Sequence, residues 1–138
     1  MIGNEPDLAG LLLGIKTIAM VGASHKPYRA SHRVMSFLQS RGYRVIPVNP
    51  ALAGKTLLGE KVYSRLTDIP EPIDMVDIFR RSEAAGDIVD EALQTDAPVI
   101  WLQLGVIHHA AAEKARLAGR TFVMDRCPKI ELEQIQAY

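Results

Sequence analysis

The sequence predicts an α/β fold, a Rossmann-like doubly wound parallel sheet with helices on both faces. Two observations predict it. Apolar runs of strand length recur along the chain, as in strands that are buried on both faces of a parallel sheet. Segments with helical spacing of apolar residues separate these runs, so strands and helices alternate through right-handed crossovers. We take 3-2-1-4-5-6 as the strand order, in which ligands bind at the carboxyl ends of the strands.

The predicted elements follow one another in the order that this fold requires. A short amphipathic helix comes first, marked by Leu8, Leu11, Leu12 and Ile15. The expected strands are TIAMVG (17–22), RVIPVN (44–49), a short edge strand KVY (61–63), IDMVDIF (73–79), PVIWLQL (98–104) and TFVMD (121–125). Apolar stripes predict helices at 34–41, 84–93 and 107–118. Ser82 is a good N-cap for the second of these helices, and Gly42 and Gly119 are good C-terminal caps for the other two. The charged residues of KIELEQIQAY (129–138) predict a solvated helix or tail.

Length and composition indicate one domain over residues 1–138, with 1–16 as a short N-terminal helix. The 16 basic and 16 acidic residues cancel, so no overall field attracts nucleic acid or a membrane surface. The N-terminus lacks the basic leader of a signal peptide, and a single cysteine fits a reducing compartment. We therefore expect a cytoplasmic protein.

The loop after the first strand has the composition of an anion site. Gly22 permits a tight turn, and Ser24 offers a hydroxyl and an amide. The next helix would aim its N-terminal N–H groups at the same point. Lys26, Arg29 and Arg33 add positive charge where a helix N-terminus normally prefers acids. The alternative is a plain turn with solvated basic side chains, but the crowding of positive charge favours an anion site.

A second basic loop follows the strand at 73–79. Phe79 is followed by Arg80 and Arg81, which places two arginines at another helix N-terminus on the same edge of the sheet. Either arginine could bind a phosphate through two hydrogen bonds. Phe79 could line a groove for a base or an apolar chain, or it could belong to the core. Two basic helix N-termini at one edge favour an anion site more strongly than one.

The loop after the second strand bears on the choice of nucleotide. NAD-binding domains usually end this strand with an acid that binds the ribose hydroxyls. Here Asn49 and Pro50 stand at that position, with Lys55 close behind. This pattern argues against NAD and suits a nucleotide with an extra ribose phosphate, such as NADP or coenzyme A. Asn-Pro is also a common turn pair.

The remaining loops supply no catalytic or metal-binding set. Gln103 and Gly105 end the strand at 98–104, and the glutamine could hydrogen-bond an amide-rich ligand. Cys127 is either a thiol at the ligand edge or a small buried apolar side chain. We interpret Asp74 and Asp77 as structural. The sequence has no nucleophile elbow, no carboxylate pair at the ligand edge and no metal-ligand spacing, so we expect neither a catalytic residue nor a metal.

Four segments carry a family resemblance: VGAS....Y..S..V...L...GY.VIPVNP, LGEKVYSRLTDIPEPIDMVDIFRRSE, WLQLG and AGRTFVMDRCPKIE. They resemble the small stand-alone CoA-binding proteins of bacteria and archaea, from Thr17 to about Glu131. Those proteins are similar to the N-terminal CoA-binding domain of the succinyl-CoA synthetase alpha subunit. The resemblance implies a Rossmann-like fold that binds coenzyme A. The synthetase performs its chemistry in a later domain that has no counterpart in this sequence, which argues for a binding module.

The resemblance also implies ligand-binding residues. Phosphate oxygens would be held by Gly22, Ala23 and Ser24, with Lys26 or Arg29 near the charged end. The adenosine part would lie near Asn49, Pro50 and Lys55. The groove for the nucleotide and the pantetheine arm would be bordered by Ile78, Phe79 and Arg80, and on its far side by Gln103, Leu104 and Gly105. Cys127 lies in a segment similar to the NCP segment of the synthetase domain.

We therefore expect a protein that binds CoA or an acyl-CoA without turnover of its own. It should bind neither nucleic acid nor a membrane, and any protein partner is left open. One alternative is an NADP-dependent oxidoreductase, which would need a second glycine near Gly22 and a substrate domain. The other is a non-catalytic interaction scaffold. We also expect Cys127 to lie within reach of the CoA thiol and to form a mixed disulfide with it.

Overall fold

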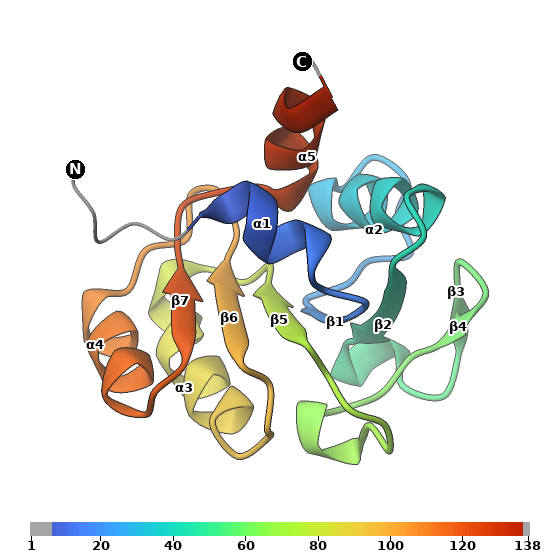
Figure 1. Ribbon diagram of the computed structural model, residues 1–138. Coiled ribbons are helices and arrows are strands. Elements are labelled where there is room, and N and C mark those ends of the chain that lie inside the picture. The colour runs from blue at the N-terminus through green and yellow to red at the C-terminus, as the bar shows by residue number, and fades with distance from the viewer. Residues whose placement is uncertain (1–6, 137–138) are drawn as a thin grey trace.

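A parallel sheet of five strands forms the centre of the molecule, in the order β2-β1-β5-β6-β7 (Figure 1). The computed structural model describes residues 7–136. The strands are β1 (Thr17–Val21), β2 (Arg44–Val48), β5 (Met75–Ile78), β6 (Val99–Leu102) and β7 (Thr121–Val123). All four of their pairings are parallel. The predicted fold class is confirmed.

Helices cover both faces of the sheet, as Figure 1 shows. One face carries α1 (Leu8–Leu13), α2 (Ala30–Ser40) and α5 (Pro128–Gln136), and the other carries α3 (Ser82–Ala92) and α4 (His109–Leu117). Successive strand residues point to opposite faces, so each strand supplies both cores. In β5, Val76 and Ile78 pack under α3 and α4, whereas Met75 packs on the other side. This is why the strands are apolar along their length.

The predicted strand order is wrong for the strand at its edge, the one expected at 61–63. In place of an edge strand at 61–63, β3 (Thr56–Leu57) and β4 (Glu60–Lys61) form a separate antiparallel hairpin, and Tyr63 makes one parallel bridge to Val48. Tyr63 N–H donates to the Pro47 carbonyl at 3.0 Å, and its carbonyl accepts from Asn49 N–H at 2.9 Å. The next bond of a parallel ladder would need an N–H on residue 47. Proline has none, so the pairing cannot extend toward Lys61.

Two local expectations were also wrong. Ser82 does not cap α3, because Arg81 occupies the N-cap position. The Ser82 hydroxyl instead accepts a hydrogen bond from Ile107 N–H at 3.0 Å and ties α3 to the loop before α4. The C-terminal segment is more than a solvated helix or tail, since Leu132 of α5 is buried in the core beneath α1 and α2. Residues 1–6, which belong to the predicted N-terminal helix, and residues 137–138 at the C-terminus lie outside the described residues.

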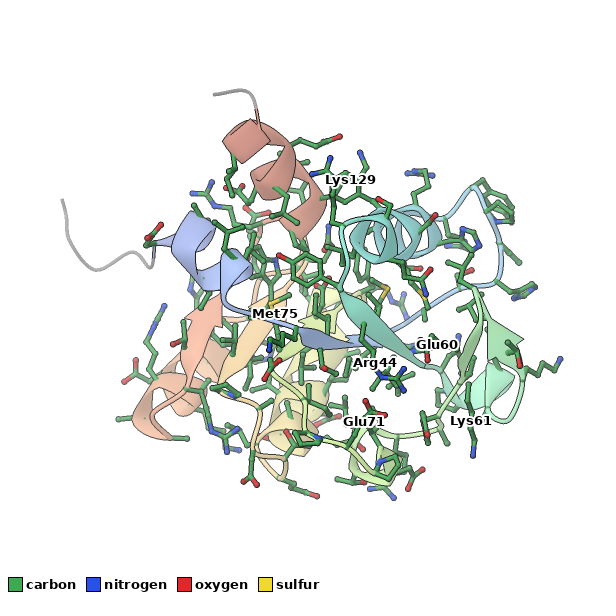
Figure 2. The ribbon with its side chains drawn as sticks, turned by 45° about the vertical axis from the view of Figure 1, so that its right-hand side comes forward. Arg44, Glu60, Lys61, Glu71, Met75 and Lys129 are labelled. Atoms are coloured by element: carbon green, nitrogen blue, oxygen red, sulfur yellow. The ribbon has the colours of Figure 1, made fainter. Side chains whose placement is uncertain are left out.

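Arg44, at the start of β2, fastens the edge of the sheet, as Figure 2 shows. Its guanidinium donates to the two carboxylate oxygens of Glu71 at 2.6 and 2.8 Å, and to Glu60 at 3.3 Å. The hydrogen bond with Arg44 holds the pKa of Glu71 below its ordinary value. These contacts lie at the amino end of the sheet, and they leave Arg44 with its charge balanced. In the part of the chain that the structure describes, no helix has the length and apolar character needed to cross a bilayer.

Candidate functional site

Loops at the carboxyl ends of the strands enclose two adjoining cavities. We call the first the basic cleft; it has a volume of about 530 Å³ and is lined by residues 22–26, 29–31, 49, 51, 52, 79–81 and 84. The second, the apolar groove, has a volume of about 650 Å³ and is lined by residues 30, 33, 34, 79–81, 103–106, 127, 129 and 130. Residues 30 and 79–81 line both cavities, so the two lie side by side.

Gly22 brings the two basic loops into contact. Its φ of +90° lies in the left-handed region that favours glycine. A Cβ at this position would lie 2.2 Å from the carbonyl oxygen of Phe79 and 3.0 Å from Cδ of Arg80. The loop after β1 therefore packs directly on the loop after β5, and only glycine allows this approach. Behind Gly22, the Ser24 hydroxyl accepts a hydrogen bond from Lys26 N–H at 3.1 Å and shapes the turn.

Asn49 links the loop after β2 to the loop after β1. Its side-chain Nδ2 donates to the carbonyl of Ala23 at 2.8 Å, and its Oδ1 accepts from Ala51 N–H at 2.9 Å. The second bond caps the short 3-10 turn Pro50–Leu52. Asn49 thus acts as the predicted turn residue and also lines the basic cleft. Its side-chain hydrogen bonds hold the wall of the cleft in place.

Four cationic side chains converge on the basic cleft: Lys26, Arg29, Arg80 and Arg81. Within residues 7–136 none of them forms an ion pair, and no carboxylate lines the cleft. Arg29 and Arg81 are the N-cap residues of α2 and α3, and neither makes a side-chain capping hydrogen bond. The N–H groups of two helix N-termini therefore add to the positive potential. A multiply charged anion would compensate both sources of positive charge.

The apolar groove contains one polar group without a partner. Gln103 is only 6% exposed, and its Oε1 is buried with no hydrogen-bond partner among the described residues. Cys127 is 5% exposed and directly precedes α5. The turn at residues 103–106 is held by a hydrogen bond from Val106 N–H to the Gln103 carbonyl at 2.8 Å, and by one from Gly105 N–H to Asp125 at 2.8 Å. The other residues that line the groove are apolar side chains and four cations, Arg33, Arg80, Arg81 and Lys129.

The structure divides the predicted site residues between the two cavities. The basic cleft is lined by Gly22, Ala23, Ser24, Lys26, Arg29, Asn49, Phe79 and Arg80. The apolar groove is lined by Gln103, Leu104, Gly105 and Cys127, and again by Phe79 and Arg80. Three predicted residues line neither of these cavities: Pro50, Lys55 and Ile78. Ile78 is fully buried in the core under α3, because it alternates with Phe79 along the chain.

Sequence reasoning missed the contribution of α5 to the groove. Lys129 and Ile130 line it, although the segment that contains them looked like a solvated tail. Figure 2 shows Lys129 between α5 and α2, and its Nζ lies 5.1 Å from the centre of the Phe37 ring. The signal was the i, i+3 spacing of Leu132 and Ile135, which indicates a packed helix. Within the described range, no group of three His, Cys, Asp or Glu residues could hold a metal ion.

Comparison with known proteins gives three informative matches. The chain matches the CoA binding domain family over residues 16–133. It is 42% identical over 127 residues to the uncharacterized protein YneT of Bacillus subtilis, and this match covers 92% of this chain and 93% of the relative. A solved structure from Thermus thermophilus, described as cell-free ID.343, has a TM-score of 0.91 at 38% identity, and the match covers 96% of this chain and 99% of that one.

A more distant relative is a subunit of a larger enzyme. The alpha subunit of the ADP-forming acetate–CoA ligase I of Pyrococcus furiosus is 29% identical over 93 residues, which is 64% of this chain. The match covers only 20% of that subunit. The similarity is therefore confined to a small part of the subunit.

Proposed function

The chain belongs to the CoA-binding domain family, and from that premise we propose that it binds coenzyme A or an acyl-CoA reversibly, without catalysing a reaction on it. The nucleotide half of CoA occupies the basic cleft. Its phosphates lie against residues 22–24 and the amino ends of α2 and α3, where Lys26 and Arg29 are in reach. The similarity to a CoA ligase subunit supports a CoA ligand, but the ligase activity belongs to a much longer protein.

One observation carries the proposal: the cleft gathers four cations and two helix N-termini but no carboxylate. Arg44, by contrast, is balanced by the carboxylates of Glu71 and Glu60. Crowding like charges without an answering group costs free energy in the unbound protein. The phosphates of CoA would recover that free energy, because each is an acceptor for charge-assisted hydrogen bonds from Lys, Arg and backbone N–H groups.

The residue types around the cavities support binding without turnover. Neither cavity is lined by a carboxylate, and His25 and Cys127 are the lining residues best able to act as a general base or a nucleophile. They line different cavities, His25 the basic cleft and Cys127 the apolar groove. A nucleophile activated by an adjacent base needs the two groups within hydrogen-bond reach. We also propose a cytoplasmic location, because a lone cysteine fits a reducing compartment.

Thermal unfolding with added ligands tests the proposal directly. CoA at about 100 times its Kd should stabilise the folded protein by about 2.7 kcal/mol and raise Tm by several degrees. NADP serves as the competing ligand, because Asn49 also suits a nucleotide with a ribose phosphate. Stabilisation by NADP and not by CoA would replace the proposal with the oxidoreductase alternative. No shift with either ligand would favour a scaffold whose cleft is empty.

A matched pair of lysine substitutions tests the position of the phosphates. Lys26→Gln removes a cation from the cleft, whereas Lys16→Gln removes an exposed lysine from the amino end of β1. We expect Lys26→Gln to weaken CoA binding by about 1.5 kcal/mol, or roughly tenfold, because it removes a charge-assisted hydrogen bond. Lys16→Gln should leave the affinity unchanged. Equal effects of the two substitutions in calorimetric titrations would contradict the placement of the phosphates.

A further inference from the structure

The two adjoining cavities differ in polarity. The basic cleft, with its four cations, meets the apolar groove at Phe79 and the two arginines that follow it. Beyond this junction the groove is walled by Val34, Val106 and Cys127, all at most 8% exposed. Arg33 and Lys129 also line the groove. A ligand that fills both cavities can therefore carry its most highly charged part in the cleft and place an apolar part against these groove residues.

Gln103 adds a requirement for a hydrogen-bond donor in the groove. Its side chain lies in the wall of the groove, and its buried Oε1 is unpartnered among the described residues. A buried acceptor without a partner destabilises the protein, and a donor supplied by a ligand would remove that cost. A chain of phosphates or a bare hydrocarbon offers no N–H group, so neither satisfies this position. A secondary amide does.

The mouth of the groove exposes large apolar side chains. Leu104 is 56% exposed and Ile130 is 40% exposed, and they come from the loop after β6 and from α5. They border the same apolar groove. Apolar side chains gathered at the opening of a pocket mark a place where a ligand or partner is covered. An aliphatic group that leaves the groove here would cover both side chains.

We propose that the groove holds the thioester end of an acyl-CoA with an aliphatic acyl group, an inference that rests on the proposed function. The buried Gln103 side chain turns toward the groove so that its Oε1 accepts an N–H of the pantetheine arm, and the acyl chain lies on Leu104 and Ile130. The order of groups along this ligand is phosphates, amides and then hydrocarbon. The cleft presents cations, and the groove presents the orphan acceptor together with exposed apolar side chains. Free CoA would leave the apolar mouth uncovered.

A chain-length series measures the proposed apolar contact. Full-length protein is titrated by calorimetry with CoA, with acetyl-, butyryl-, hexanoyl- and octanoyl-CoA, and with 3′-phospho-ADP, which lacks the arm. Affinity should rise with acyl length by up to about fourfold per methylene, the factor that corresponds to about 0.8 kcal/mol per buried CH₂. Equal affinities for CoA and hexanoyl-CoA would overturn the inference and leave the proposed function standing. Failure of CoA and 3′-phospho-ADP to bind would instead reject the proposed function.

Three variants assign the effect to the groove. The double substitution Leu104→Ser and Ile130→Ser should flatten the chain-length series, whereas Leu117→Ser should preserve it, because Leu117 is 80% exposed on α4 and lines neither cavity. Gln103→Leu should weaken CoA binding about tenfold relative to 3′-phospho-ADP, the loss expected for a hydrogen bond to a buried acceptor. Binding of 3′-phospho-ADP also reports that this variant is folded. An equal loss for both ligands would remove Gln103 from the proposed contact with the arm.

Discussion

Asp77 lies in the middle of the sheet, and its replacement by asparagine tests whether the protein folds around an uncharged acid. The residue is fully buried on β5, between Met20 of β1 and Trp101 of β6. Neither of its carboxyl oxygens has a hydrogen-bond partner among residues 7–136. Burial without a partner raises the pKa of Asp77 well above the ordinary value of 3.8, because the charged form loses its hydration.

The direction of the pH effect follows from this raised pKa. Between 3.8 and the pKa of the folded state, the folded protein keeps a proton that the unfolded chain has released. The folded state then binds more protons than the unfolded state, so the free energy of unfolding falls as the pH rises. The stability contributed by protonated Asp77 is complete below 3.8 and is lost as the pH rises through that window.

The size of the effect is set by the linkage between protons and folding. One pKa unit corresponds to 1.36 kcal/mol, so the wild-type protein should lose about 1.4 kcal/mol of stability per pH unit inside the window. Asp77→Asn keeps the shape of the side chain but cannot ionise, so it lacks this slope. At the acidic end of the window the two proteins should have similar stability, because both then carry a neutral polar group. The variant should gain on the wild type as the pH rises.

Urea denaturation at half-unit steps of pH measures this difference. Subtracting the unfolding free energies of wild type and variant removes the titration of all other groups, including Glu71. Asp77→Leu provides a second non-ionising variant; its absolute stability will differ, but its slope against pH should equal that of Asp77→Asn. A difference between wild type and Asp77→Asn that does not vary with pH would refute the reasoning, because Asp77 would then have the same proton affinity in both states.

Two further predictions concern the loops of the site. Gly22→Ala should destabilise the protein by more than the ~1–2 kcal/mol of a left-handed backbone alone, because the new Cβ would meet the Phe79 carbonyl at 2.2 Å. Gly54→Ala is the control in urea denaturation, since its φ of +86° is similar but a Cβ there meets nothing within 4 Å. Equal losses of unfolding free energy in the two variants would contradict the contact between the loops. On incubation with CoA disulfide, the Cys127 thiolate should attack one sulfur, release a CoA thiolate and keep the other CoA as a mixed disulfide, seen as a gain of one CoA in intact mass. Cys127→Ser should gain nothing, and a native protein that stays unmodified while the denatured one reacts would reject this reading.

The sheet was predictable because a buried parallel strand must be apolar on both faces. The apolar runs that form β1, β5 and β6 are almost uninterrupted. They have the length of strands and end before the neighbouring helices begin. The gathering of basic loops was predictable for a related reason. Parallel strands all end at one edge, so loops that are distant in sequence, such as those at Gly22 and Arg80, must meet there.

Other features depended on single backbone groups that a pattern does not reveal. Pro47 removes a hydrogen-bond donor from its strand, but only the register shows that the missing N–H faces the outer edge, beside Tyr63. Ser82 has the composition of an N-cap, yet the approach of Ile107 N–H provides its hydroxyl with another partner. Such choices are decided by which donors lie within about 3 Å of a side chain in the folded protein.

Asp74 and Asp77 show which properties of a residue can be predicted from sequence and which depend on the fold. Sequence determined that both belong to one apolar strand region and that neither fits a catalytic pair. Only the fold placed the Asp74 carboxylate 3.0 and 2.9 Å from the N–H groups of Lys16 and Thr17, while Asp77 received no partner. The same holds for the orphan acceptor of Gln103 in the groove. Apolar periodicity is a local property, which sequence encodes, but hydrogen-bond satisfaction depends on atoms that are brought together from distant segments.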